Sequence, residues 1–458
     1  MGFRRRCPEE ARSSLSRTIE DTLPPEGPTP DQRRKNVRCE ARPPKGRRWT
    51  VIVSSPYKPA CSSYQNFNWC AKTTLGSVEP WKRSRLNICF EIVEGKDDLR
   101  QLYAAWEELY SARTFEASLS VSWTEALLKS HLESYPVTTI VLRDVTSVVG
   151  IMPLYIKTVS KARASLLTLC PVAEHFNTHS DILLRDYSVE AMAALLKGIS
   201  SIKARWDVFR INRFVVGHPA LQAMDCALRG TAKLPYRIDV NEPSFYIPLQ
   251  GGFDTYLKER SGNTRSSIKR LGKKLYASGD VKIVRYHDNY DPKITFQTIR
   301  LIEDRSWKHK NGTGITSTET QRVFYQELCR QEFAEGRLRL WVLHLNERPI
   351  AYELGIVSEG RYYDVHGSYD HEFKNEGPGT ILFALVIREL MEEGMHELDF
   401  FGEPFEAQRR WTQVARCHRA LLIYNRTPNA YLFRAFNAVR DVMAAPSQRE
   451  LAVRRARE

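Results

Sequence analysis

From residue 88 onward, apolar side chains follow two alternating spacings along the chain. Leu99, Leu102, Trp106, Leu109 and Tyr110 recur at the spacing of one helix face, and residues 123–132 predict a second helix. Extended apolar runs follow at 138–142, 148–156 and 166–169, then a helix at 189–202 and a strand at 206–211. The predicted order is two helices, a hairpin, a strand, a helix and a strand.

The same order of spacings returns between residues 253 and 401. A basic helical stretch at 253–278 comes first, followed by a strand at 281–284 and helices at 294–307 and 319–335. A hairpin at 339–357, a strand at 361–369, a helix at 380–393 and a strand at 397–401 complete it. Two halves with a similar order of elements predict a duplicated α/β fold.

The first 85 residues have neither of these spacings. They are rich in proline and basic residues, as at 22–28 and 42–48, and such a composition cannot bury a core. We expect a disordered basic tail over 1–85, two halves at 86–245 and 246–440, and a charged C-terminal tail at 441–458. An arm that binds nucleic acid or acidic lipid stays open as an alternative for the first segment.

Charge and cysteine spacing limit the classes of function. The net charge is +14, but residues 1–90 hold 18 Lys and Arg against 8 Asp and Glu, so the rest is nearly neutral. A neutral body argues against a nucleic-acid partner. The nine cysteines never form a C-x-x-C pair, so no metal is expected.

The apolar runs also bear on location. No run approaches the roughly 20 residues that cross a bilayer. The basic start of the chain is not followed by the apolar segment of a secretory signal. We therefore expect a cytoplasmic protein without a transmembrane segment, and peripheral membrane association stays open.

The most informative local motif is Gly377-Pro378-Gly379-Thr380, directly before the amphipathic helix at 380–393. Glycine lets the backbone approach a ligand closely, and proline at a helix start removes an amide that needs no partner. The remaining amides of the first turn and the helix dipole form an anion site that suits a diphosphate. An ordinary helix start is the alternative interpretation of the tetrapeptide alone.

A basic stretch at 258–285 stands near this motif in the second half. Arg265, Lys269 and Lys273 fall four residues apart on one helix face. They are candidates for holding further phosphates or an anionic acceptor. A solvated helix face is the equally plain alternative.

Residues 245–412 resemble the acetyltransferase domain of CelD-like proteins, a GNAT branch associated with bacterial cellulose and exopolysaccharide biosynthesis. The resemblance is carried by Arg265-x-x-Ile268-Lys269-Arg270, Pro349-Ile350-Ala351, Arg361-Tyr362-Tyr363, Ser368-Tyr369-Asp370, Gly377-Pro378-Gly379 with Leu382, and Asp399-Phe400 with Gly402 and Trp411. The branch is similar in fold to Fem-type aminoacyl transferases, which also pair two GNAT-like halves. The resemblance implies tandem GNAT-like domains, with acetyl-CoA or another acyl-CoA as co-substrate.

In GNAT-type transfer a base on a strand beside the thioester accepts the proton of the attacking amine. By position the candidates are Asp364 and His366, with Glu353 on the neighbouring strand, and Tyr369 is a candidate proton donor to the thiolate. Because side chains alternate along a strand, we expect Asp364 and His366 to share one face. The chain departs from the family at residues 405–408, where Tyr-Lys is often found, which puts a tyrosine donor there in doubt.

The first half has no glycine-rich turn before its helix at 189–202. The incoming loop at 171–177 predicts that this half does not hold CoA in the same way and instead shapes an acceptor cleft or is structural. His175, His179 and Asp181 follow no tight metal-site spacing, and a polar loop is the better interpretation.

The predicted function is an acyl-CoA-dependent N- or O-acyltransferase that acts on an unknown amine or hydroxyl acceptor. Two alternatives remain from the sequence. One is a Fem-like transferase that uses aminoacyl-tRNA, and the other is a non-catalytic accessory protein of polysaccharide synthesis.

Overall fold

The computed structural model describes residues 88–455, apart from 114, 162–163, 177, 233 and 403–404. The predicted disordered tail at 1–85 lies outside the described residues. No described helix is both long and apolar enough to span a bilayer.

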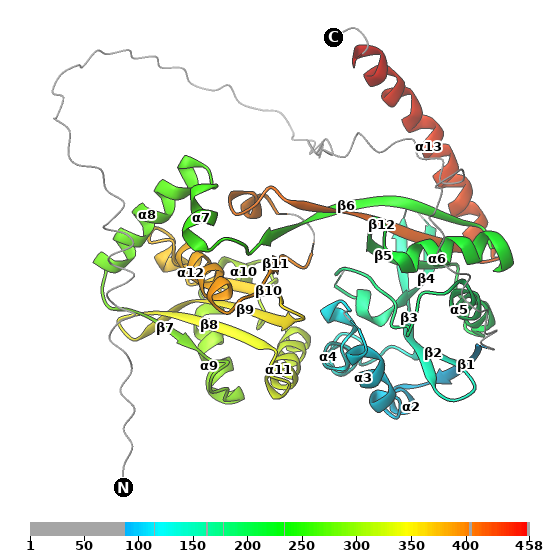
Figure 1. The fold of residues 1–458 in the computed structure, drawn as a ribbon, viewed down its shortest axis with the longest axis horizontal. Helices are drawn as coiled ribbons and strands as arrows, with labels where there is room; N and C mark the ends of the chain where they lie inside the picture. Colours follow the sequence, from blue (N-terminus) through cyan, green and yellow to red (C-terminus); the bar gives the residue numbers. More distant parts are fainter. Residues whose placement is uncertain are drawn as a thin grey trace, which may run out of the picture. The chain divides into compact units, whose positions relative to one another are not determined.

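Twelve strands form one sheet in the order β1-β2-β3-β4-β5-β12-β6-β11-β10-β9-β8-β7 (Figure 1). The strands are β1 (Cys89–Glu94), β2 (Val137–Arg143), β3 (Val148–Lys161), β4 (Ala164–Pro171), β5 (Val208–Val215), β6 (Tyr236–Pro248), β7 (Val281–Arg285), β8 (Leu338–Leu345), β9 (Arg348–Ser358), β10 (Arg361–Tyr369), β11 (Glu397–Asp399) and β12 (Ala415–Tyr424). The α-helices are α2 (Lys96–Arg100), α3 (Tyr103–Ser111), α4 (Val121–Lys129), α5 (Val189–Ser201), α6 (Pro219–Ala227), α7 (Phe253–Lys258), α8 (Gly262–Ala277), α9 (Pro292–Glu303), α10 (Trp307–Lys310), α11 (Glu319–Ala334), α12 (Pro378–Glu392) and α13 (Pro428–Arg455). Single helical turns η1 (Ala117–Leu119), η2 (Val172–Glu174), η3 (Leu228–Ala232), η4 (His371–Phe373) and η5 (Glu406–Arg410) complete the described elements.

The two halves of the sheet repeat one topology. In the first half β1 to β4 are antiparallel neighbours, and β4 then pairs with β5 in parallel across helix α5. In the second half β7 to β10 are antiparallel neighbours, and β10 pairs with β11 in parallel across helix α12. The duplicated α/β fold predicted from the order of spacings is therefore confirmed.

The two halves exchange their last strands at the middle of the sheet. β6 follows the first half in the chain but pairs with β11 of the second half, and β12 follows the second half but pairs with β5 of the first. β6 and β12 also pair with each other, so the sheet is continuous across both halves (Figure 1). The boundary expected near residue 245 falls inside β6, and the one near residue 440 falls inside α13.

Alternation along β12 shows how the exchange is stabilised. Leu421 and Ile423 are buried in the core of the first half, while Leu422 and Tyr424 face a small cluster around Ala430 of α13. Each fully buried aliphatic side chain contributes about 1.5–3 kcal/mol relative to exposure. The strand that ends the second half thus completes the hydrophobic core of the first.

Helices cover both faces of the second half-sheet. α12 and α8 pack on one face, and Trp341 and Tyr362 of the sheet point toward α12. α9 and α11 pack on the opposite face against Tyr352 and Leu354. We call these the α12 face and the α9 face.

The single basic helix predicted at 253–278 is wrong in one respect, because the structure has two helices, α7 and α8. The side chain of Ser261 caps α8 by accepting a hydrogen bond from the amide of Thr264. The Arg265 guanidinium donates to the carbonyls of Lys258 and Arg260 at the end of α7. Arg265 therefore fastens a helix break, a role that the helical spacing could not show.

We predict that Leu421→Ala lowers the free energy of unfolding by about 2–5 kcal/mol, because it opens a cavity in a core that β12 completes. Chemical denaturation measures the change. The control is Val240→Ala on β6, whose side chain is 72% exposed; it should change stability by less than about 0.5 kcal/mol. Equal effects of the two substitutions would contradict the assigned packing of β12.

Candidate functional site

An opening forms where the parallel strands β10 and β11 separate. The two strands pair only through Arg361, Tyr362 and Tyr363 of β10. β11 then ends at Asp399, while β10 continues to Tyr369 with β9 as its sheet partner. The stretch 364–369 of β10 is therefore a free strand edge. The backbone amide of Asp370, just beyond this stretch, donates a hydrogen bond to the Ile350 carbonyl of β9. Backbone groups alternate in direction along an antiparallel strand, so those of Gly367 and Tyr369 point away from β9 and toward the opening.

Charged side chains surround the point at which the strands separate. The Arg416 guanidinium donates to both Glu397 and Asp399 of β11. Arg361 Nε lies 2.8 Å from Glu397, and its Nη1 lies 3.4 Å from Glu116 of the first half. Asp399 is fully buried, so its carboxylate depends on these cationic partners.

The glycine-rich turn lies at the start of α12, beside the free edge of β10. Gly377 has φ of 65°, a left-handed conformation that favours glycine, and Pro378 occupies the first helical position. A Cβ atom at Gly377 would stand 2.7 Å from Leu271, and one at Gly379 would stand 3.1 Å from the ring of Tyr369. The two glycines therefore allow helix α8 and strand β10 to approach the turn.

Two of the amides expected to face a diphosphate are in fact used within the helix. The N–H groups of Thr380 and Ile381 both donate to the Gly377 carbonyl. Among the described residues the Gly379 amide has no such partner. The Thr380 hydroxyl lies 3.4 Å from the Arg410 guanidinium. The donors available at this turn are thus one amide, a hydroxyl and a guanidinium rather than a row of free amides.

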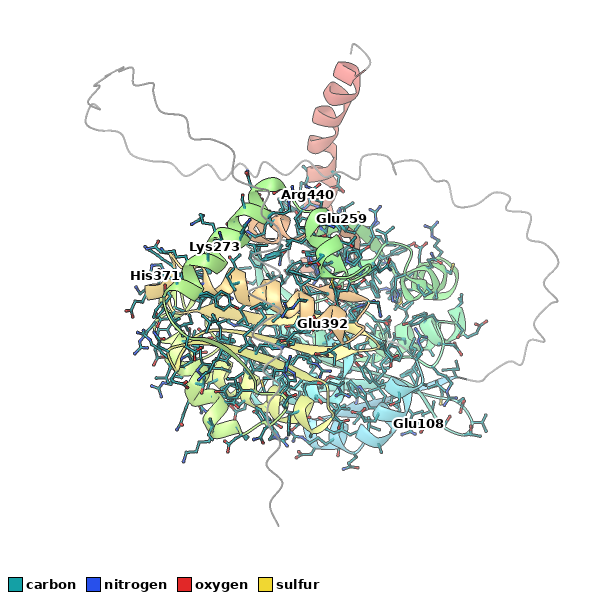
Figure 2. The ribbon with its side chains drawn as sticks, turned by 60° about the vertical axis from the view of Figure 1, so that its left-hand side comes forward. Glu108, Glu259, Lys273, His371, Glu392 and Arg440 are labelled. Atoms are coloured by element: carbon teal, nitrogen blue, oxygen red, sulfur yellow. The ribbon has the colours of Figure 1, made fainter. Side chains whose placement is uncertain are left out.

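The basic helix α8 contributes less to the turn than its sequence suggests. Lys274 lies 3.3 Å from the Glu376 carboxylate and 3.3 Å from the Asn375 carbonyl, which fastens the loop before the turn. Lys273 is exposed on the outer surface of α8 (Figure 2). Arg265 is bound to carbonyls at the end of α7, as described above.

Two carboxyl groups form a pair on the α12 face beside the free edge. Glu353 of β9 and Asp364 of β10 share a hydrogen bond. Burial raises the pKa of Glu353 well above its usual range, and the nearby charge of Asp364 adds to the shift. Burial raises the pKa of Asp364 to about 6, while the hydrogen bond from Glu353 and the charge of Lys308 limit the increase. Of the two carboxyl groups, Asp364 is therefore the more acidic.

The expectation that Asp364 and His366 share a face is wrong. The register of β10 against β9 shifts between these residues, so that Val365 is an extra residue in the strand. Asp364 pairs with Gly355 on the α12 face, whereas His366 pairs with Leu354 on the α9 face. A β-bulge of this kind breaks the alternation on which the expectation depended.

His366 is held within the packing of the α9 face. Its Nδ1 atom lies 2.7 Å from the Tyr352 hydroxyl, which itself donates to Glu303. Burial and then the charge of Lys308 lower the pKa of His366 well below its usual range. The neutral imidazole is therefore separated by the sheet from the carboxyl pair.

Tyr369 ends the free edge of β10, two residues beyond Gly367, which lies opposite Glu353. Its ring contacts the turn at Gly379. Five residues of strand separate it from Asp364, which corresponds to about 16 Å. Tyr369 therefore lies at the end of the opening beside the glycine-rich turn.

Lys308 is a residue of the opening that the sequence did not indicate. It comes from the short helix α10, and its Nζ donates to the Gly367 carbonyl at 2.5 Å. In the sequence it stands in the run Trp307-Lys308-His309-Lys310, which reads as an ordinary solvated end of a helix. No local signal distinguishes it from Lys310.

The corresponding opening of the first half is filled by the protein itself. β4 and β5 pair only at Thr168 and Leu169 of β4. Beyond this point Glu174 accepts hydrogen bonds from the Asn212 amide at 2.9 Å and the Ser180 hydroxyl at 2.6 Å. Burial raises the pKa of Glu174 to about 7, although these hydrogen bonds oppose the shift. The two halves therefore share a topology but not a site.

The loop of the first half brings histidines to separate places. His175 packs against His131, whereas His179 Nε2 lies 2.9 Å from the Ser244 hydroxyl. Asp181 accepts a hydrogen bond from the Tyr187 hydroxyl. In the part of the chain that the structure describes, no three His, Cys, Asp or Glu residues are grouped as metal ligands.

Comparison with known proteins agrees with the topology of the second half. Residues 262–409 match the model of the acetyltransferase (GNAT) domain. The chain thus contains a GNAT domain that extends from α8 to η5. No match was found among curated protein sequences.

Solved structures with a similar arrangement include FemX, with a TM-score of 0.49 and 14% identity over 75% of this chain and 99% of that chain. The C-terminal domain of a putative lysylphosphatidylglycerol synthetase from Agrobacterium fabrum has a TM-score of 0.44 and 9% identity, covering 73% and 95%. A tandem GNAT protein from the clavulanic acid biosynthesis pathway has a TM-score of 0.39 and 10% identity. The match covers 74% of this chain and 99% of that chain. At these TM-scores the likenesses say nothing about function.

We predict that Arg416→Met lowers the free energy of unfolding by about 3–5 kcal/mol, because it leaves the buried Asp399 carboxylate without its main cation. Urea denaturation measures the loss. Arg419→Met on the same strand is the matched control, since Arg419 forms no ion pair with the residues that the structure describes. Similar stability of the two variants would mean that the cation at the separation point is not needed.

Proposed function

We propose that the chain is an acyl-CoA-dependent N- or O-acyltransferase whose donor site lies along the free edge of β10. The observation that carries this proposal is the arrangement of the opening. A set of anion donors stands at one end, beside Gly379, and a carboxyl pair stands further along the strand, where Glu353 lies opposite Gly367. Acyl-CoA has a diphosphate, an arm with two amides and a reactive thioester in that order, which suits such a groove.

The diphosphate end would be held by the anion site at the start of α12. The Gly379 amide, the Thr380 hydroxyl and the Arg410 guanidinium are the donors available there. The helix dipole adds a positive potential at the same place. Along the free edge, the Gly367 amide and the backbone groups of Tyr369 are available to pair with the amides of the arm, while Lys308 holds the Gly367 carbonyl.

Asp364 is the proposed proton acceptor. The amine or hydroxyl of the acceptor attacks the thioester carbonyl carbon, the C–S bond breaks, and CoA leaves as the thiolate. The acceptor proton passes to the Asp364 carboxylate, which the protonated Glu353 holds in place by its hydrogen bond. His366 has no part in this step, because it lies on the α9 face. Tyr369 remains a candidate wall of the diphosphate end.

The acceptor is proposed from the resemblance alone. The likeness of residues 245–412 to CelD-like proteins supports an amine or hydroxyl group from cellulose or exopolysaccharide synthesis. Because acyl-CoA is a cytoplasmic thioester, the proposal also implies a cytoplasmic location. A panel of amino sugars, sugar hydroxyls and aminoacyl-tRNA, assayed with acetyl-CoA and longer acyl-CoAs, would identify the acceptor and the acyl group.

We predict that Gly379→Glu abolishes binding of acetyl-CoA and longer acyl-CoAs in calorimetric titration. The side chain would fill the space beside Tyr369, and its carboxylate would repel the diphosphate. Gly262→Glu is the matched control, because it makes the same change at the start of α8, where a Cβ meets nothing within 4 Å. Unaltered acyl-CoA binding by the Gly379 variant would refute the proposed donor site.

We predict that Asp364→Asn lowers kcat by about 10²–10⁴-fold with acyl-CoA binding retained, since the base is lost but the groove remains. In the unaltered protein kcat/KM should rise with pH through about 6, because only ionised Asp364 accepts the proton. Release of free CoA thiol over a pH series measures both. Asp304→Asn, at an exposed position, is the control, and a rate loss of equal size in that variant would count against Asp364.

A further inference from the structure

Lys308 holds a position in the opening that the proposed mechanism does not use. Antiparallel alternation turns the Gly367 carbonyl toward the opening, and Lys308 Nζ donates to it at 2.5 Å. Ser306 caps α10 by accepting from the His309 amide, which fixes the short helix that carries the lysine. The lysine is half-buried at the free edge of β10, whereas Lys310 on the same helix is exposed.

Lys308 lies beside the carboxyl pair, because it binds the Gly367 carbonyl and Gly367 is the strand partner of Glu353. A Cβ atom at Gly367 would stand 2.3 Å from the Glu353 carboxylate. His366 of β10 also interacts with the lysine, on the α9 face. Glu303 belongs to α9, Glu353 to β9 and Asp364 to β10, and all three act on the lysine. Burial lowers the pKa of Lys308, and the three carboxyl groups oppose that shift. The lysine in turn lowers the pKa values of Glu353 and Asp364.

Other charged groups near the carboxyl pair either raise its pKa values or are bound to other partners. Asp399 of β11 raises the pKa of Asp364. Arg416 and Arg361 are engaged with Asp399, Glu397 and Glu116 at the separation point. Lys308 is a cation that acts on both carboxyl groups and favours their ionised state.

We infer that Lys308 is a positioning residue that keeps one proton, rather than two, on the Glu353–Asp364 pair and so sets the acid limit of acyl transfer. The consequence for acyl transfer rests on the proposed function, whereas the protonation of the pair does not. Without the ammonium group, two buried carboxyl groups beside Asp399 would both be neutral at a pH where one is now ionised. The lysine reaches the pair only through its charge, because its hydrogen bond goes to the Gly367 carbonyl.

The test separates the charge of Lys308 from its hydrogen bond. Lys308→Gln keeps a donor for the Gly367 carbonyl but removes the charge, and Lys308→Arg keeps both. Infrared difference spectra over a pH series report protonated carboxyl groups without any substrate, and Glu353→Gln and Asp364→Asn assign the bands. We expect the second proton to bind the pair at a pH about one unit higher in Lys308→Gln. The Arg variant and the control Lys310→Gln should titrate like the unaltered protein.

An unchanged carboxyl titration in Lys308→Gln, with the native circular dichroism spectrum, would overturn the inference. If Lys308→Gln does not fold, the Lys308→Arg variant decides. A shift of one pH unit in its carboxyl titration, although the positive charge is kept, would also overturn the inference. The kinetic consequence is a parallel shift of the acid limb of kcat, with KM for acyl-CoA unchanged. Failure of the unaltered protein to bind any acyl-CoA would reject the proposed function alone, because the spectra need no turnover.

Discussion

The separation of β10 from β11 is the constraint on which the candidate site depends. If β11 paired with β10 as far as Tyr369, the backbone groups of Gly367 and Tyr369 would be hydrogen-bonded to β11. No free strand edge would then remain beside α12. Ion pairs surround the point of separation. Arg416 and Arg361 hold Glu397 and Asp399 at the end of β11, where a buried carboxylate without a cation would cost several kcal/mol. The same arginines reach Glu116, so the first half contributes to the geometry of the second half's opening.

The two halves show that one topology does not make one site. Each has a parallel strand pair that separates after two or three residues, and each has a helix that follows the separating strand. In the first half, Glu174 satisfies the exposed amide of Asn212 from within the chain. In the second half, the Gly367 carbonyl accepts a hydrogen bond from the Lys308 side chain. The two halves therefore differ in which groups cover the backbone at the point where the strands separate.

The sequence predicted the fold of each half better than their connection or the site. The order of helices and strands followed from apolar spacing, because burial on one face imposes a period that can be read locally. The pairing of β12 with the first half could not be predicted from the sequence. Apolar residues such as Leu421 and Ile423 indicate that the strand is buried, but not in which of the two cores. The glycine turn at 377–379 could be located from its composition. The hydrogen bond from the Thr380 amide to the Gly377 carbonyl could not be predicted. Val365 is the clearest case, because one inserted residue moved His366 to the other face and placed Gly367, rather than His366, opposite Glu353.

A buried hydrogen-bond chain shows why the halves are coupled at the middle of the sheet. His418 Nδ1 lies 3.0 Å from the Arg213 carbonyl, which can only accept, so this nitrogen carries the proton. Burial lowers the pKa of His418 to about 2, so its Nε2 accepts from the Ser244 hydroxyl at 2.8 Å. The hydroxyl oxygen then accepts from His179 Nε2 at 2.9 Å. This chain links β5, β12 and β6 to the loop of the first half, and His179 Nδ1 ends it 3.5 Å from Asp399. Displacing the halves would leave these buried groups unpaired at once, so a ligand is better accommodated at the free edge of β10 than by opening the interface.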